Sequence, residues 1–123
     1  MKYLGLAYFT PEKFDEMPPD DVKALVSQCP ALDEKMRATG KMLVSASLGD
    51  LDKWKTLRPR GGKTQITDGP YTESKEVVGG LFIIEADSPE EALRIAAMHP
   101  AAQIGEAGGW AVELMPTDFY LSL

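Results

Sequence analysis

The stretch Val77-Val78-Gly79-Gly80-Leu81-Phe82-Ile83-Ile84-Glu85-Ala86 decides the fold of this chain of 123 residues. Its apolar run ends at Ile84 and is short, branched and aromatic, which predicts a buried strand. Because successive side chains of a strand point to opposite faces, Leu81 and Ile83 face one side, and Phe82 and Ile84 face the other. Both faces of this strand therefore need a cover.

The segments around this strand alternate between strand and helix patterns. Apolar residues at a helical period follow Asp20 and Asp21, and Pro30 predicts a kink in that helix or two helices end to end. A second helix starts at Ser88-Pro89-Glu90-Glu91, where a capping box precedes alanines and leucines, and it closes at Pro100. Strands are expected at 2–9, 41–48, 77–86 and 110–115, with a hairpin of short strands at 54–58 and 63–67 and a loop at 10–19.

This order is two strand–helix halves separated by a hairpin, which predicts an α+β fold with a ferredoxin-like βαβ-hairpin-βαβ sheet. We expect one domain, residues 1–123, with both helices on one face of the sheet. The other face would then expose apolar side chains, and a second copy of the chain is the simplest cover. Ser45 and Ser47 are expected to lie on that bare face and to make it less apolar.

Composition excludes several classes of protein. The chain has 13 basic and 19 acidic residues, a net charge of -6, which opposes binding to nucleic acid and to anionic membranes. No apolar run is long enough to span a bilayer, and we expect a cytoplasmic location. One cysteine, Cys29, and one histidine, His99, rule out zinc sites with several such ligands in one chain. We therefore expect no metal and no cofactor.

One loop carries a motif. The segment Asp68-Gly69-Pro70-Tyr71-Thr72-Glu73-Ser74-Lys75-Glu76, followed by Gly79-Gly80, resembles the YCII-related family and, within it, the branch named for an Asp-Gly-Pro-Phe motif. Tyr71 stands where that branch usually has Phe. The resemblance covers nearly the whole chain, and it includes Gly40, Arg58 and the late helix that ends in His99-Pro100.

The resemblance implies a ferredoxin-like fold that dimerises into a dimeric α/β barrel, and it implies no settled function. Members of the branch often lie near genes for extracytoplasmic-function sigma factors. The narrower YCII proteins carry a candidate His-Asp dyad whose histidine lies early in the first helix, and this chain has no histidine there. Met115 stands where the branch tends to have Arg before the final proline.

The motif loop has two interpretations. Asp68-Gly69-Pro70 is a typical turn, in which the aspartate can bond its own backbone. Alternatively, the turn holds charged groups at the mouth of a pocket, where a neighbouring lysine prepares a carboxylate to accept a proton. The candidate catalytic residues are Asp68, Glu76 and His99, and the candidate ligand-binding residues are Arg58, Gly69, Tyr71, Glu73 and Lys75.

His99 is expected in the last turn of its helix, where the helix dipole favours a cation, and the alternative is a general base. Cys29 is expected in the core.

Two functions remain open. The first is a homodimer that binds a small molecule between its sheet and the loop and acts on it by metal-free acid–base chemistry. The second is a non-enzymatic accessory or regulatory protein of a sigma-factor system. An enzyme should gather some of Arg58, Asp68, Glu76 and His99 around one cavity.

Overall fold

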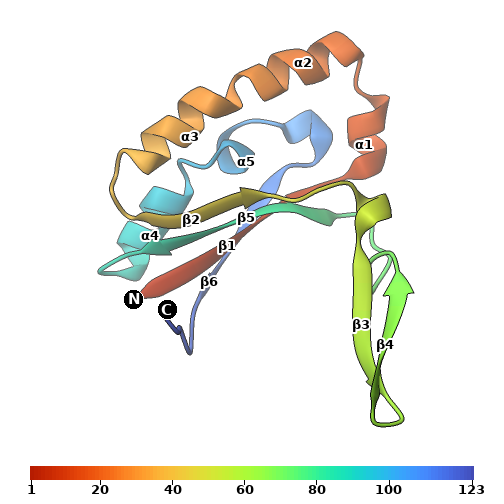
Figure 1. Ribbon diagram of the computed structural model, residues 1–123. Helices are drawn as coiled ribbons and strands as arrows, with labels where there is room; N and C mark the ends of the chain where they lie inside the picture. Colours follow the sequence, from red (N-terminus) through yellow and green to blue (C-terminus); the bar gives the residue numbers. More distant parts are fainter.

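The computed structural model describes residues 1–123 and contains a four-stranded antiparallel sheet with the order β2-β5-β1-β6. Its strands are β1 (Lys2–Phe9), β2 (Met42–Ser47), β5 (Val77–Glu85) and β6 (Ala111–Pro116). The helices lie on one face of this sheet (Figure 1). The chain therefore has the ferredoxin-like α+β fold that the order of its segments predicts.

Five helices cover that face: α1 (Pro11–Glu16), α2 (Pro19–Ser27), α3 (Cys29–Arg37), α4 (Pro89–Ala96) and α5 (Pro100–Gln103). Pro30 divides the first predicted helix into α2 and α3, because it sits in the first turn of α3, where no backbone donor is needed. The predicted loop at 10–19 is wrong in part. Pro11 starts the short helix α1 there, and the Phe14 N–H donates to the Thr10 carbonyl.

The core lies between the sheet and the helices. Phe82 and Ile84 are fully buried and pack with Met36 of α3 and Ile95 of α4. Their neighbours in β5, Leu81 and Ile83, point to the face without helices, as strand alternation predicts. The capping prediction for α4 is also confirmed, because the Ser88 hydroxyl accepts a hydrogen bond of 3.1 Å from the Glu91 N–H.

Strand β2 departs from simple alternation. The register against β5 shifts between Met42 and Val44, which indicates a bulge at this point. Ser45 then lies opposite the buried Phe82, and Ser47 lies opposite Gly80. Residues directly opposite each other in a ladder point to the same face. The two serines therefore face the helices, and the prediction that they lie on the bare face is wrong.

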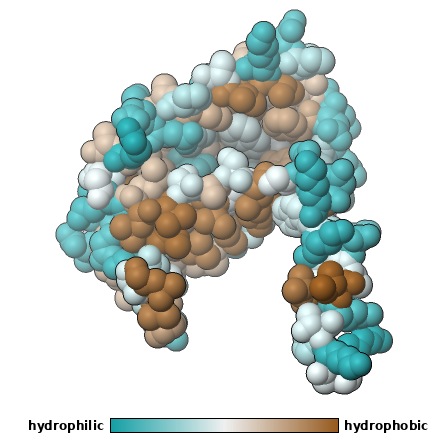
Figure 2. All heavy atoms as spheres, viewed as in Figure 1, coloured by the Kyte–Doolittle hydropathy of each residue, from teal (hydrophilic) through white to brown (hydrophobic).

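The predicted hairpin is present as β3 (Lys55–Arg60) and β4 (Lys63–Asp68), and it forms a sheet of its own. It projects from the main sheet on the side opposite the helices (Figure 1). Leu57 and Ile66 face each other across it and are 62% and 64% exposed. Figure 2 shows hydrophobic atoms on the hairpin, on the helix-free side of the body and on the C-terminal segment. None of the helices combines the length and apolar character needed to cross a membrane.

Candidate functional site

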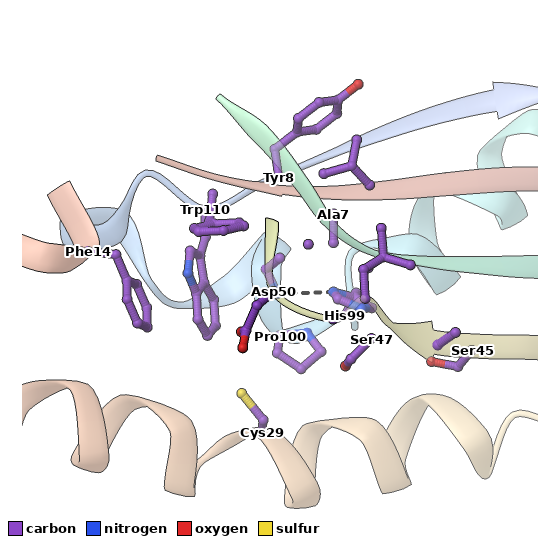
Figure 3. A pocket seen from close by; sticks show the side chains of 18 of the residues that line it. Ala7, Tyr8, Phe14, Cys29, Ser45, Ser47, Asp50, His99, Pro100 and Trp110 are labelled. Carbon is purple, nitrogen blue, oxygen red and sulfur yellow. Dashed lines mark hydrogen bonds between the residues drawn. The ribbon is translucent and has the colours of Figure 1, made fainter. Parts of the chain in front are cut away.

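A cavity of about 550 Å³ lies between the helix-covered face of the sheet and helices α1 and α3 (Figure 3). Strands β1, β2 and β5 form its floor, where Gly79 and Gly80 contribute no side chains. Ligand pockets usually fall between about 300 and 1,000 Å³. The polar side chains of the lining are Cys29, Asp33, Ser45, Ser47, Asp50 and His99.

Aromatic side chains form one end of this cavity. The rings of Phe14 and Trp110 stack with centroids 6.4 Å apart and planes inclined by 11°, and Phe9 meets Phe14 edge-on at 6.1 Å. Gly105 makes room for Trp110, because a Cβ atom there would lie 2.2 Å from the indole, and its φ of 85° also favours glycine. A flat, rigid and largely apolar wall results.

The sequence predicts that His99 lies in the last turn of α4, and this prediction is wrong, because α4 ends at Ala96. His99 precedes α5 as the N-terminal cap, and its Nδ1 accepts a hydrogen bond of 3.1 Å from the Ala101 N–H. Its ring stacks on Phe82 with centroids 5.0 Å apart. Burial lowers the pKa of His99, and the nearby negative charge of Asp33 opposes that shift. The imidazole is therefore held in its neutral form near pH 7.

The bond from Ala101 also determines which nitrogen of His99 carries the proton. Because Nδ1 is an acceptor, the proton of the neutral ring is on Nε2. No protein group bonds that Nε2–H. His99 therefore offers the cavity a hydrogen-bond donor rather than a free lone pair. The general-base interpretation of His99 does not fit this geometry.

Cys29 lies half-buried at the start of α3 and lines the cavity instead of lying in the core. Burial raises the pKa of its thiol, and the charge of Asp33 raises it further. The thiol therefore stays protonated at neutral pH and is a poor nucleophile.

The motif residues 68–76 begin at the end of strand β4 of the hairpin, and none of them lines the helix-side cavity. Asp68 ends β4 with its side chain 88% exposed and pairs with Lys55, which lowers the pKa of the Asp68 carboxyl. Two hydrogen bonds of 2.8 Å fix the backbone of Gly69. Its N–H donates to the carbonyl oxygen of Trp54, and its own carbonyl oxygen accepts from Thr56 Oγ1. The Asp68 carboxylate thus bonds a lysine and does not brace its own turn.

Three of the other loop candidates line a second, open hollow of about 650 Å³. Tyr71, Glu73 and Glu76 line it, and Lys75 is exposed outside it. The guanidinium of Arg58 lies over the Tyr71 ring at 5.3 Å from its centroid, and the Nε of Arg58 is buried without a hydrogen-bond partner. Of the eight sequence candidates, only His99 lines the helix-side cavity.

The two hollows are neighbours. Tyr8, Leu51, Trp54 and Val78 line both of them, so these four residues form a common wall. Arg58, Asp68, Glu76 and His99 nevertheless do not surround one cavity, so the structure does not assemble the active site expected from these four residues in the sequence. No three side chains of the His, Cys, Asp or Glu type come together as a metal site would require.

Sequence reasoning missed most of the cavity. Ser45 and Ser47 were assigned to the wrong face, because the bulge in β2 leaves no mark in the residue pattern. Asp50 is not among the candidates from the sequence, although its carboxylate points into the cavity (Figure 3). Phe14 and Trp110 are far apart in the sequence, and only the folded chain stacks them. The one available signal was the alternation of serines within a predicted strand.

Comparison with known proteins places the chain in a family. It is 29% identical over 96 residues to an uncharacterised protein of Rhizobium meliloti (strain 1021), which covers 78% of this chain and 77% of that protein. Its fold is similar to that of 5-chloro-2-hydroxyhydroquinone dehydrochlorinase from Burkholderia phenoliruptrix AC1100, solved in complex with 2,5-dihydroxybenzoquinone. That similarity has a TM-score of 0.50 at 19% identity, over 96% of this chain and 94% of the other. Residues 1–115 match the YCII-related domain, and the chain belongs to the family of YCII-related domain proteins.

Proposed function

We propose that this protein binds a small molecule in the helix-side cavity and transfers a proton on it without a metal. The observation that carries the proposal is the position of His99, the single histidine of the chain, as a neutral donor that faces a cavity of about 550 Å³. Neutral histidine that donates to a carbonyl oxygen stabilises the negative charge that develops when a neighbouring C–H proton leaves.

The lining also contains the groups that can take that proton. Asp33 and Asp50 are its two carboxylates, and Figure 3 shows Asp50 directed into the cavity. A carboxylate base with a neutral histidine donor is an established pairing for proton abstraction next to a carbonyl. The dehydrochlorinase with this fold was solved with a planar ring that carries carbonyl and hydroxyl groups.

Deuterium exchange of para-hydroxyacetophenone in D₂O tests this function. The wild-type protein is expected to accelerate loss of the methyl protons next to the carbonyl, because His99 stabilises the enolate oxygen. His99→Phe removes the donor and should reduce the acceleration at least tenfold, which corresponds to about 1.4 kcal/mol. Gln103→Ala is the control, since this exposed side chain of α5 lies outside the cavity. Equal exchange with and without wild-type protein would contradict the catalytic proposal.

Binding is measured separately by two-dimensional NMR with the same ketone. Chemical-shift changes are expected at Ser47, His99 and Ala101, which line the cavity. The hairpin residues Arg60 and Lys63 lie outside it and should not respond. Shifts confined to the motif loop would instead favour the open hollow beside Tyr71.

A further inference from the structure

The formal charges around the helix-side cavity are all of one sign. Its lining contains the carboxylates of Asp33 and Asp50 and no lysine or arginine. His99, whose ordinary pKa lies nearest to neutrality among the side chains of the lining, is held neutral by burial. An anionic ligand would therefore enter the cavity without a counter-charge, against two carboxylates and a net charge of -6 on the chain.

The uncharged part of the lining favours a flat ring. Phe14 and Trp110 present stacked aromatic planes at one end, and Trp54 also lines the cavity. At Gly79 and Gly80 the floor has no side chains. Aromatic rings stack offset or edge-on with such walls, and this geometry selects planar ligands over branched ones.

The remaining polar groups fit uncharged oxygen atoms. Ser45 and Ser47 project from β2 on the same side as His99, and their hydroxyls both donate and accept (Figure 3). Nε2–H of His99 donates. These groups match carbonyl and hydroxyl oxygens, whereas a carboxylate would need a cationic or multiple-donor partner that the lining lacks.

We infer that the cavity selects an uncharged planar ring bearing carbonyl or hydroxyl groups, and that Asp33 and Asp50 exclude ligands bearing a carboxylate or phosphate. This inference rests on the proposed function, since it names the chemical class of the ligand for the same cavity. The selection is electrostatic, so salt weakens it, because mobile ions screen partly solvated charges.

Isothermal titration calorimetry with two probes of nearly the same shape tests the inference. The probes are para-hydroxyacetophenone and para-hydroxybenzoate, in which a methyl group is exchanged for a charged oxygen. At pH 7.5 and low salt, the neutral ketone should bind the wild-type chain at least tenfold more tightly. At high salt the ratio should fall. These expectations need no variant, so they hold whether or not a substitution perturbs folding.

The double variant Asp33→Asn with Asp50→Asn should reduce the preference at least fivefold by improving the binding of para-hydroxybenzoate. Asp52→Asn is the matched control, because Asp52 is exposed, lies two residues from Asp50 and does not line the cavity. It should leave the ratio unchanged. Circular dichroism of both variants verifies that they fold.

The outcomes separate the two proposals. If para-hydroxybenzoate binds the wild-type chain as tightly as the ketone, the inference about charge is overturned and the binding proposal stands. If para-hydroxybenzylammonium binds tenfold more tightly than the ketone, the assignment of an uncharged ligand is overturned in favour of a cation. If none of the three probes binds, the proposed function itself fails, and the inference fails with it.

Discussion

Gly5 shows how a single residue determines the packing of the core. A Cβ atom at this position would lie 2.1 Å from Cζ of Phe82, and Phe82 is fully buried and cannot move aside. We expect Gly5→Ala to lower the free energy of unfolding by about 1–3 kcal/mol, as overpacking of a filled core does. Urea denaturation measures it. Gly49→Ala is the control, because no heavy atom lies within 4 Å of its Cβ position, and an equal loss there would contradict the explanation.

His99 allows a second prediction at this scale. Its pKa is lowered by burial, so its NMR titration midpoint should lie below the ordinary value of about 6.5. Nitrogen-15 shifts should report a proton on Nε2, since Nδ1 accepts from Ala101. Because the folded state resists protonation, the stability from neutral His99 is present above about pH 6.5 and is lost as the pH falls below it. A proton on Nδ1 at neutral pH would contradict the assigned role.

At the level of elements, the hairpin depends on Thr56 more than on the aspartate of the motif. Thr56 is 9% exposed, and its hydroxyl donates to the Gly69 carbonyl at 2.8 Å. Thr56→Val keeps the shape and removes this donor, so we expect a loss of about 1 kcal/mol in the free energy of unfolding. Asp68→Ala should cost less, because its pair with Lys55 is solvent-exposed. Urea titration of both variants measures the two losses. A larger loss for Asp68→Ala than for Thr56→Val would show that Asp68 stabilises the turn.

Strands β1 and β5 are joined by a charge pair whose effect depends on pH. The ammonium group of Lys2, paired with Glu85 at 2.6 Å, and a hydrogen bond from the amino terminus lower the pKa of Glu85 to about 2. Since the folded pKa is depressed, the resulting stability is present above about pH 4.5 and disappears as the pH falls towards 2. We expect Glu85→Gln to lower Tm at pH 7 and to have a much smaller effect at pH 2.5.

Thermal unfolding across this pH range measures the effect. Glu73→Gln is the control, because its side chain is exposed in the motif loop. A Tm difference for Glu85→Gln that stays constant from pH 7 to pH 2.5 would show that the pair does not control acid stability.

At the scale of the molecule, the face of the sheet without helices exposes apolar side chains. Leu81 and Ile83 lie there beside Leu4 and Leu6 of β1, and the hairpin projects on the same side with Leu57 exposed (Figure 1). We propose that a second copy of the chain covers this face as a symmetric homodimer, because burial yields about 25 cal/mol per Å² of apolar surface. The hairpin residues Arg60 and Lys63 are basic and exposed in a chain of net charge -6, so they favour contact with a second copy.

Light scattering after size-exclusion chromatography should give twice the chain mass of 13.4 kDa. Leu81→Lys places a charge in the proposed interface and should produce a monomer that keeps its circular dichroism spectrum. Leu93→Lys is the matched control, since Leu93 is 62% exposed on α4, on the opposite side of the sheet. A wild-type monomer at micromolar concentration would contradict the proposed dimer.

The sequence by itself determined the order of the strands and the main helices, because helical period, strand alternation, Pro30 and the Ser88 cap act through neighbours in the chain. It also identified the family, through residues 68–76. It did not show the short helices α1 and α5. Only the tertiary structure decided which residues share a site. The bulge in β2 turned Ser45 and Ser47 toward the helices, and β5 placed Phe82 under His99. The pKa and tautomer of His99 depend on burial and on a bond from Ala101, and burial arises from contacts between segments distant in sequence.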